Sequence, residues 1–295
     1  MNSCSINLDN SYGNTVYDNK KSSEKYNLKD FSKGCVSLLP LLGTGVINTV
    51  VNSKISPAFA NVSGPIQDEF RNSAKLAFDK TNIASKGVAF IDTSKITDSQ
   101  IKELIDNSLS KSSKLPKFLQ NMRIKDVNTA FKMSQMGANA YFLPEINKIA
   151  VNLELNPYSS CHEIGHAMNK YSKFGKILQS SRKLGILALP VILITAFKKN
   201  KPQGEKPVGV VDKVTTFVKD NSGKLAFAAW LPTLLEEGLA SIKGAKLAKG
   251  ILSPEAFKKM NVLNLRGFAT YFIAASCAAL GCSCIKYVQE KFATK

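Results

Sequence analysis

The sequence predicts a mainly α-helical, membrane-embedded protein with a small β hairpin or sheet beside the one helix that carries both histidines of the chain. Apolar residues gather in a few runs, which are separated by stretches rich in Lys, Ser and Asn. Two short apolar strands precede the histidine helix, whose two histidines lie four positions apart. With 295 residues, the chain can also bury a large core in one or two domains.

The first 64 residues divide into a polar tail and an apolar segment. Residues 1–35 are rich in Asn, Ser, Lys and Tyr without periodicity, which predicts a disordered tail. Residues 36–64 are predicted to be an apolar anchor and linker, although the run 36–51 is short for a membrane span. Residues 58–60, Ala-Phe-Ala, resemble a signal-peptidase site. We favour an anchor or interfacial helix first, a signal peptide second and a buried helix third.

Residues 65–295 form the predicted main domain, which opens with helix and strand signals in turn. An amphipathic helix is expected over 66–78 and a strand over 87–92. A second helix is expected over 97–110, with Thr97 as its N-cap.

A β hairpin is predicted over 139–152, where two short apolar strands flank a turn at 144–148. It lies directly before the histidine helix, which we place at about 157–171. A strand edge here could accept an extended peptide as an added strand. The residues that would contact such a peptide are Asn139, Ala140 and Tyr141. The alternative is an ordinary sheet edge without a ligand.

Three further apolar runs lie at 184–197, 225–235 and 267–288. The last run is long enough for the hydrocarbon core of a bilayer and is the best transmembrane candidate. Ser253 and Pro254 are suited to the N-cap and first position of the helix that leads into it. The other two runs are short for full spans, which leaves three alternatives. They are tilted spans that their flanks continue, a re-entrant pair, or core helices. A polar, lysine-rich loop is expected between them, at 198–224.

The chain has 40 basic and 22 acidic residues, a formal net charge of +18. Its lysines are spread along most of the chain, which is typical of a solubilising surface and adds attraction to anionic membrane lipid. No basic stripe with interleaved aromatic residues occurs, so nucleic acid is not expected as a partner.

The six cysteines make no C-x-x-C pair and no disulfide framework. We expect most of them to be reduced packing residues, with palmitoylation or thiol chemistry as the alternative for the last three. They are Cys4, Cys35, Cys161, Cys277, Cys282 and Cys284.

The two histidines form the pattern His162-Glu163-Ile164-Gly165-His166. Positions i and i+4 lie on the same face of a helix, so both imidazoles can point at one metal ion. This H-E-x-x-H pattern is typical of zinc hydrolases, in which the glutamate takes a proton from the metal-bound water. We therefore expect one zinc ion per chain, with His162 and His166 as ligands and Glu163 as the general base.

A catalytic zinc site usually has three protein ligands and one open position. Since no histidine remains, the third ligand must be a carboxylate or a cysteine. The strongest candidate is Glu237, which is followed by small residues that would permit close approach to the histidine helix. Its neighbour Glu236 is the alternative. Both glutamates end a long apolar run, where a charge without a partner would be costly.

These motifs resemble the neutral zinc metallopeptidases of bacterial membranes, the YugP-like group, and more distantly the gluzincin-type CAAX-processing and heat-shock membrane proteases. The resemblance covers about residues 137–290 and includes the hairpin, the H-E-x-x-H helix and Glu237-x-x-Ala-Ser241. It implies a membrane-embedded gluzincin-like core in which His162, His166 and Glu237 bind zinc. Where the distant relatives often have Asp, this chain has Ser241, which could orient a ligand only more weakly.

The expected function is peptide-bond hydrolysis by a multi-pass membrane metalloendopeptidase. The related families imply an active site on the cytoplasmic side. Because Glu237 must return to the metal that His166 binds, the chain must cross the membrane an even number of times between them. Besides zinc, a tyrosine hydroxyl could stabilise the oxyanion that forms during hydrolysis. The available residues are Tyr141, Tyr158 and Tyr171, but nothing in the sequence selects among them. The alternatives are a non-catalytic membrane scaffold with a structural zinc site and a soluble or secreted zinc protease whose apolar runs are buried.

Overall fold

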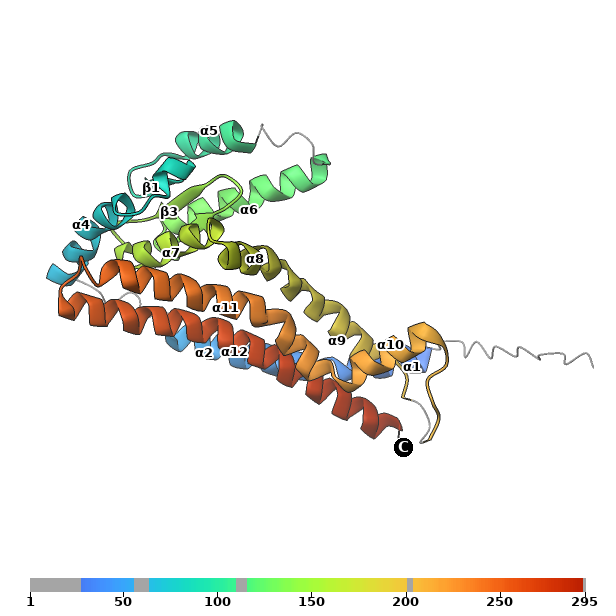
Figure 1. The fold of residues 1–295 in the computed structure, drawn as a ribbon. Coiled ribbons are helices and arrows are strands. Elements are labelled where there is room, and N and C mark those ends of the chain that lie inside the picture. The colour runs from blue at the N-terminus through green and yellow to red at the C-terminus, as the bar shows by residue number, and fades with distance from the viewer. Residues whose placement is uncertain (1–27, 56–63, 110–115, 201–203, 294–295) are drawn as a thin grey trace, which may run out of the picture.

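The computed structural model describes residues 28–55, 64–109, 116–200 and 204–293. It is mainly helical with one small mixed sheet, which confirms that part of the predicted fold class. Figure 1 shows two long helices side by side, α11 (Ser222–Ala248) and α12 (Pro254–Ala293), with the sheet near one end of this pair. Residues 1–27 of the expected tail, and the signal-peptidase-like residues 58–60, lie outside the described ranges.

The sheet has the strand order β1-β3-β2. The strands β2 (Tyr141–Leu143) and β3 (Lys148–Val151) are antiparallel, which confirms the predicted hairpin. The predicted strand over 87–92 is β1 (Ala89–Asp92), and it pairs with β3 in parallel, so β3 is central and β2 is an edge. The hairpin turn includes Asn147 with φ of 54°, a backbone region that asparagine tolerates better than most residues.

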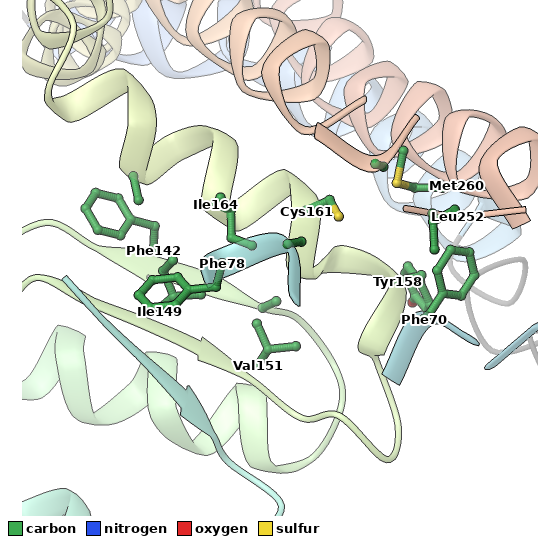
Figure 2. Close-up of a cluster of buried hydrophobic side chains, with 14 of the residues drawn as sticks. Phe70, Phe78, Phe142, Ile149, Val151, Tyr158, Cys161, Ile164, Leu252 and Met260 are labelled. Atoms are coloured by element: carbon green, nitrogen blue, oxygen red, sulfur yellow. The ribbon is translucent and has the colours of Figure 1, made fainter. Parts of the chain in front are cut away.

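Successive residues of β3 face opposite sides of the sheet, as the alternation of a strand requires. Ile149 and Val151 face a core formed with α4 (Pro65–Asp79), α7 (Ser160–Lys170) and α12, drawn in Figure 2. Ala150 faces a second core beneath α5 (Asp98–Leu109) and α6 (Lys117–Gln135). The sheet is thus covered on both faces, and one of the two covers is the histidine helix.

The helices α4, α5 and α7 match the predicted ranges closely. Thr97 caps α5 as expected, because its Oγ1 accepts from Gln100 N while Gln100 Oε1 accepts from Thr97 N. Ser253 caps α12 in the same way, accepting from Ala256 N. The first turn of the predicted histidine helix is a short 3-10 helix, Pro157–Ser159, which leads directly into α7.

Two predictions about helices need correction, and one helix was not predicted. Residues 28–35 of the expected tail are helical, because α1 (Leu28–Ser37) packs on α9 (Ala188–Phe197), where the Phe31 and Phe197 rings stack 5.7 Å apart. The expected polar loop at 198–224 contains a helix, α10 (Gly209–Asp220). The helix α6 was not predicted, because apolar residues such as Phe118 and Met122 lie on its exposed side and blur its periodicity.

Four segments of the described chain are long and apolar enough to cross a membrane, which indicates a membrane protein. They are Leu28–Val51, Lys173–Phe197, Ser222–Ala248 and Pro254–Lys291. The two short apolar runs are therefore extended by their flanks. The run at 184–197 is continued backwards by a 3-10 segment and α8 (Lys173–Ser181), and the run at 225–235 lies inside α11. The fourth segment contains the predicted span 267–288.

We predict that the protein stays with membranes under alkaline carbonate, because large apolar side chains cover the outer faces of these helices. The measurement is fractionation of expressed protein after carbonate extraction without detergent. Release into the soluble fraction would instead support the reading of the apolar runs as buried core helices.

Candidate metal centre

The helices α7 and α11 approach each other unusually closely at two glycines. A Cβ atom added to Gly165 would overlap the backbone carbonyl of Ala240, and one added to Gly244 would overlap the carbonyl of Cys161. Each glycine of one helix therefore faces the backbone of the other. This contact brings the histidine face of α7 against the middle of α11.

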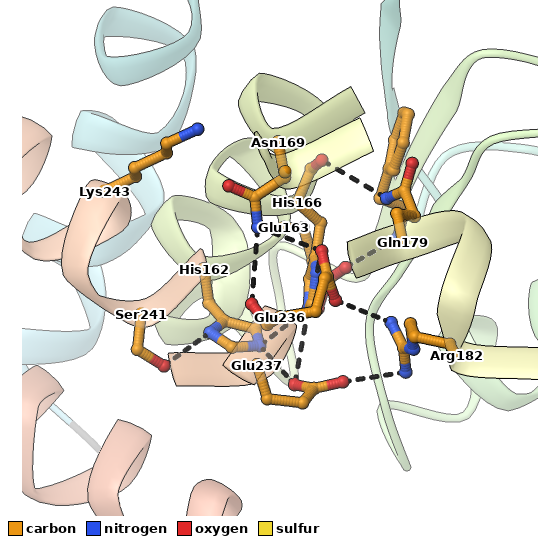
Figure 3. A network of polar contacts seen from close by, with 12 residues as sticks. His162, Glu163, His166, Asn169, Gln179, Arg182, Glu236, Glu237, Ser241 and Lys243 are labelled. Atoms are coloured by element: carbon orange, nitrogen blue, oxygen red, sulfur yellow. Dashed lines mark hydrogen bonds and ion pairs between the residues drawn. The ribbon is translucent and has the colours of Figure 1, made fainter. Parts of the chain in front are cut away.

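At this contact, three side chains converge on one point (Figure 3). His162 Nε2 lies 3.0 Å from His166 Nε2, and these two nitrogens lie 3.2 and 3.4 Å from Glu237 Oε2. The structure places Glu237, rather than its neighbour Glu236, in this group. The three residues could hold a metal ion, since their donor atoms all lie within 4.8 Å of one another.

The spacing of the donor atoms agrees with tetrahedral coordination. Ligand atoms about 2.0–2.1 Å from a zinc ion in a regular tetrahedron are about 3.3 Å apart. The charge also fits, because Glu163, Glu236 and Glu237 bring three buried carboxylates to the site and Arg182 brings one guanidinium. A divalent cation would balance the remaining formal charge, which would otherwise be costly in a buried place.

Nδ1 of each imidazole, the nitrogen that points away from the donor group, also has a partner. His166 Nδ1 lies 2.8 Å from Glu236 Oε1, and His162 Nδ1 lies 3.1 Å from Ser241 Oγ. Such contacts fix the ring orientation and the tautomer, so that Nε2 is the nitrogen offered to a metal. Glu236 is thus the partner of His166, and Ser241 is the partner of His162.

Arg182 joins the two glutamates of α11. Its Nη1 donates to Glu236 Oε2 at 2.9 Å and its Nη2 donates to Glu237 Oε1 at 2.8 Å. Asn169 of α7 also donates to Glu236 Oε1, at 2.9 Å. The fork of the guanidinium therefore holds both carboxylates and leaves Glu237 Oε2 directed at the two histidines.

Glu163 is buried and faces the edge strand of the sheet. Its Oε2 accepts a hydrogen bond of 2.5 Å from the backbone N–H of Phe142 in β2. The carboxylate is close enough to His166 and Arg182 to contribute to the electrostatics of both. The hairpin and the histidine helix thus meet at the predicted general base.

The electrostatics of the metal-free site favour a proton on His166. Burial alone would lower the pKa of this imidazole, but the nearby Glu237 and Glu236 carboxylates raise it to about 10. A metal ion at Nε2 must displace this proton, so metal binding releases a proton and strengthens as the pH rises.

Several predicted residues lie apart from the donor group. Ala140 is buried in the core, and its N–H is bonded to Asn139 Oδ1. Tyr158 is also buried in the core, and the hydroxyl of Tyr171 donates to the carbonyl of Lys86. Tyr141 is half-buried at the start of β2.

The structure adds residues that sequence reasoning missed. Arg182 lies more than fifty positions before the glutamates that it binds, and no local pattern marks it. Tyr271 of α12 lies close enough to Glu237 to interact with it. Among the cysteines in the described ranges none is paired, and Cys161 is buried on the core side of α7, as expected for a packing residue.

Comparisons of the chain with protein-family models, with curated proteins and with solved structures find no match.

We predict that Gly165→Ala abolishes metal retention and lowers the melting temperature, because the new methyl group would push α7 away from α11. Overpacking of this kind typically costs about 1–3 kcal/mol or more. Metal analysis and thermal melting on one preparation test this. The control is Gly267→Ala in α12, where an added Cβ meets nothing within 4 Å, so metal content should not change. Full metal retention by Gly165→Ala would show that the close contact is not needed.

We also predict that Glu237→Gln loses most of its bound metal, since a donor carboxylate is replaced. Glu236→Gln should bind metal about 10–100-fold more weakly, the usual cost of removing the partner of a metal-bound histidine. The two variants are matched in size, charge and position. Competition with a chelator measures both affinities. Stronger loss in Glu236→Gln than in Glu237→Gln would assign the ligand to Glu236.

Proposed function

We propose that the protein is a zinc-dependent membrane metalloendopeptidase with a gluzincin-like core. The observation that carries this proposal is the convergence of the two histidine nitrogens and Glu237 Oε2 at the helix that also bears Glu163. Ligands and a potential base on one helix are what metal-assisted hydrolysis needs.

Zinc is the metal that this donor set favours. Two imidazole nitrogens and one carboxylate oxygen form a ligand set that occurs in zinc peptidases, with the fourth position open. In the described parts of the chain, the group has three members and no fourth His, Cys, Asp or Glu completes it. A structural zinc site usually has four protein ligands, so the three-membered group supports a catalytic role.

A bound zinc ion would supply Lewis-acid polarisation of the scissile carbonyl and lower the pKa of a water molecule at the open position. The chain itself would provide the proton acceptor. Phe142 N–H donates to Glu163 Oε2 and so orients the carboxylate, whose other oxygen would accept the proton of the attacking water. The same carboxyl group would then deliver this proton to the leaving amine.

A peptide substrate would lie along the edge strand β2. β2 has β3 on one side only, and its Phe142 N–H points outward at Glu163. A peptide that extends along this edge would therefore pass beside the proposed base. Tyr141, at the start of the edge strand, is placed to contact such a peptide.

We predict that Glu163→Gln keeps its zinc but lowers the rate of peptide cleavage by roughly two to four orders of magnitude, the usual contribution of a positioned general base. The substitution preserves side-chain size and touches none of the three donor groups. Metal content, melting temperature and cleavage rate should be measured on one preparation.

The matched control is Glu103→Gln, an exposed glutamate of α5 away from the site, which should cleave at the wild-type rate. If the Glu163→Gln protein holds zinc and cleaves as fast as Glu103→Gln, Glu163 is not the general base. If wild-type protein binds stoichiometric zinc but cleaves no peptide, the centre is structural and the scaffold alternative replaces the enzyme.

A further inference from the structure

The helix α10 exposes an apolar face. Val210, Val211, Val214 and Phe217 are 77%, 77%, 53% and 60% exposed. At 100° per residue, these four positions lie on one side of the helix. Val208, just before the helix, is 78% exposed and extends the same apolar surface.

The opposite face of α10 is polar and packs on the protein. Asp212 forms an ion pair with Lys198 and accepts from the backbone N–H of Val208 at 2.7 Å. Lys219 is 5% exposed and donates to the carbonyl of Lys198. A helix on the surface of a water-soluble protein has the reverse arrangement, with its apolar side inward. The surroundings of α10 are therefore expected to be apolar.

The place of α10 in the chain identifies these surroundings. It connects α9 to α11, and each belongs to a segment that could cross a membrane. Figure 1 shows α10 at the end of the bundle away from the sheet. A short helix that connects two membrane-spanning segments lies where the chain leaves the bilayer and returns to it. The exposed Lys213 and Lys224 on and beside it suit lipid phosphate groups.

We propose that α10 is an interfacial helix that inserts its valine and phenylalanine face into the bilayer surface at the turn between α9 and α11. Such helices bury their apolar side about 5–10 Å into the boundary between headgroups and acyl chains. The occupant of the exposed face is thus lipid, and the ion pair of Asp212 with Lys198 fixes which face is turned outward.

This placement also sets the depth of the metal centre. Glu237 follows Ser222, the first residue of α11, by fifteen positions, or about 22 Å along the helix axis at 1.5 Å per residue. The hydrocarbon core is about 30 Å thick. The donor group would therefore lie in the leaflet opposite α10, near the membrane surface on which the sheet rests.

Tryptophan fluorescence in lipid vesicles tests the proposal with the full chain, because Trp230 is its single tryptophan. In a Trp230→Phe background, Phe217→Trp places a reporter on the apolar face of α10. Lipids that carry a quencher near the headgroup should quench it more than lipids labelled at the chain end, as expected at interfacial depth. Val210→Trp is a second reporter on the same face, so the result does not depend on one substitution.

The matched control is Glu103→Trp in the same background, since Glu103 is an exposed polar position on α5, which covers one face of the sheet. It should respond to iodide in the water and not to labelled lipid. Reporters on α10 that behave like this control would overturn the proposal. Shielding from both quenchers would also overturn it, because a second copy or another protein would then cover the face. Stronger quenching at chain-end depth would also overturn it, because α10 would then lie inside the hydrocarbon core and not at its surface.

Discussion

The geometry of the candidate metal centre depends on the close contact between α7 and α11. Gly165 lies against the carbonyl of Ala240, and Gly244 lies against the carbonyl of Cys161, so the two helix axes come closer than any larger residue would permit. Only at this separation can one glutamate oxygen of α11 lie 3.2–3.4 Å from the imidazole nitrogens of α7. The geometry of the donors is thus a consequence of backbone packing, and the packing is specified by two glycines.

The sequence of α11 combines packing and chemistry on one helical face. Glu237, Ala240, Ser241 and Gly244 follow one another at intervals of three, one and three residues, so they share the face that meets α7. Glu237 reaches the donor group, Ser241 contacts His162, and the two small residues permit the approach. Glu236, a quarter-turn away, reaches the far side of His166. Arg182 then neutralises part of the buried charge that both glutamates bring.

Local patterns predicted the parts of this fold that depend on short-range order. The alternation of apolar residues gave the hairpin, the spacing of His162 and His166 gave a shared helix face, and Thr97 and Ser253 marked the starts of two helices. Contacts between residues far apart in the sequence have no such local pattern. The parallel pairing of β1 with β3 and the hydrogen bonds of Arg182 to α11 depend on tertiary packing. The helix α10 was missed because the prolines, glycines and lysines of 198–209 indicated a loop, although Val210, Val214 and Phe217 have the spacing of an amphipathic helix.

A zinc titration of the metal-depleted protein decides whether this group of residues is a catalytic zinc centre. Purified protein in detergent is stripped with a chelator, and the cleavage of an unfolded protein substrate is followed as zinc is restored in known amounts. If it is, cleavage returns in proportion to zinc and reaches its plateau at one equivalent per chain, as a single three-ligand site requires. Binding of one zinc without any cleavage, or cleavage that is indifferent to zinc, would contradict it.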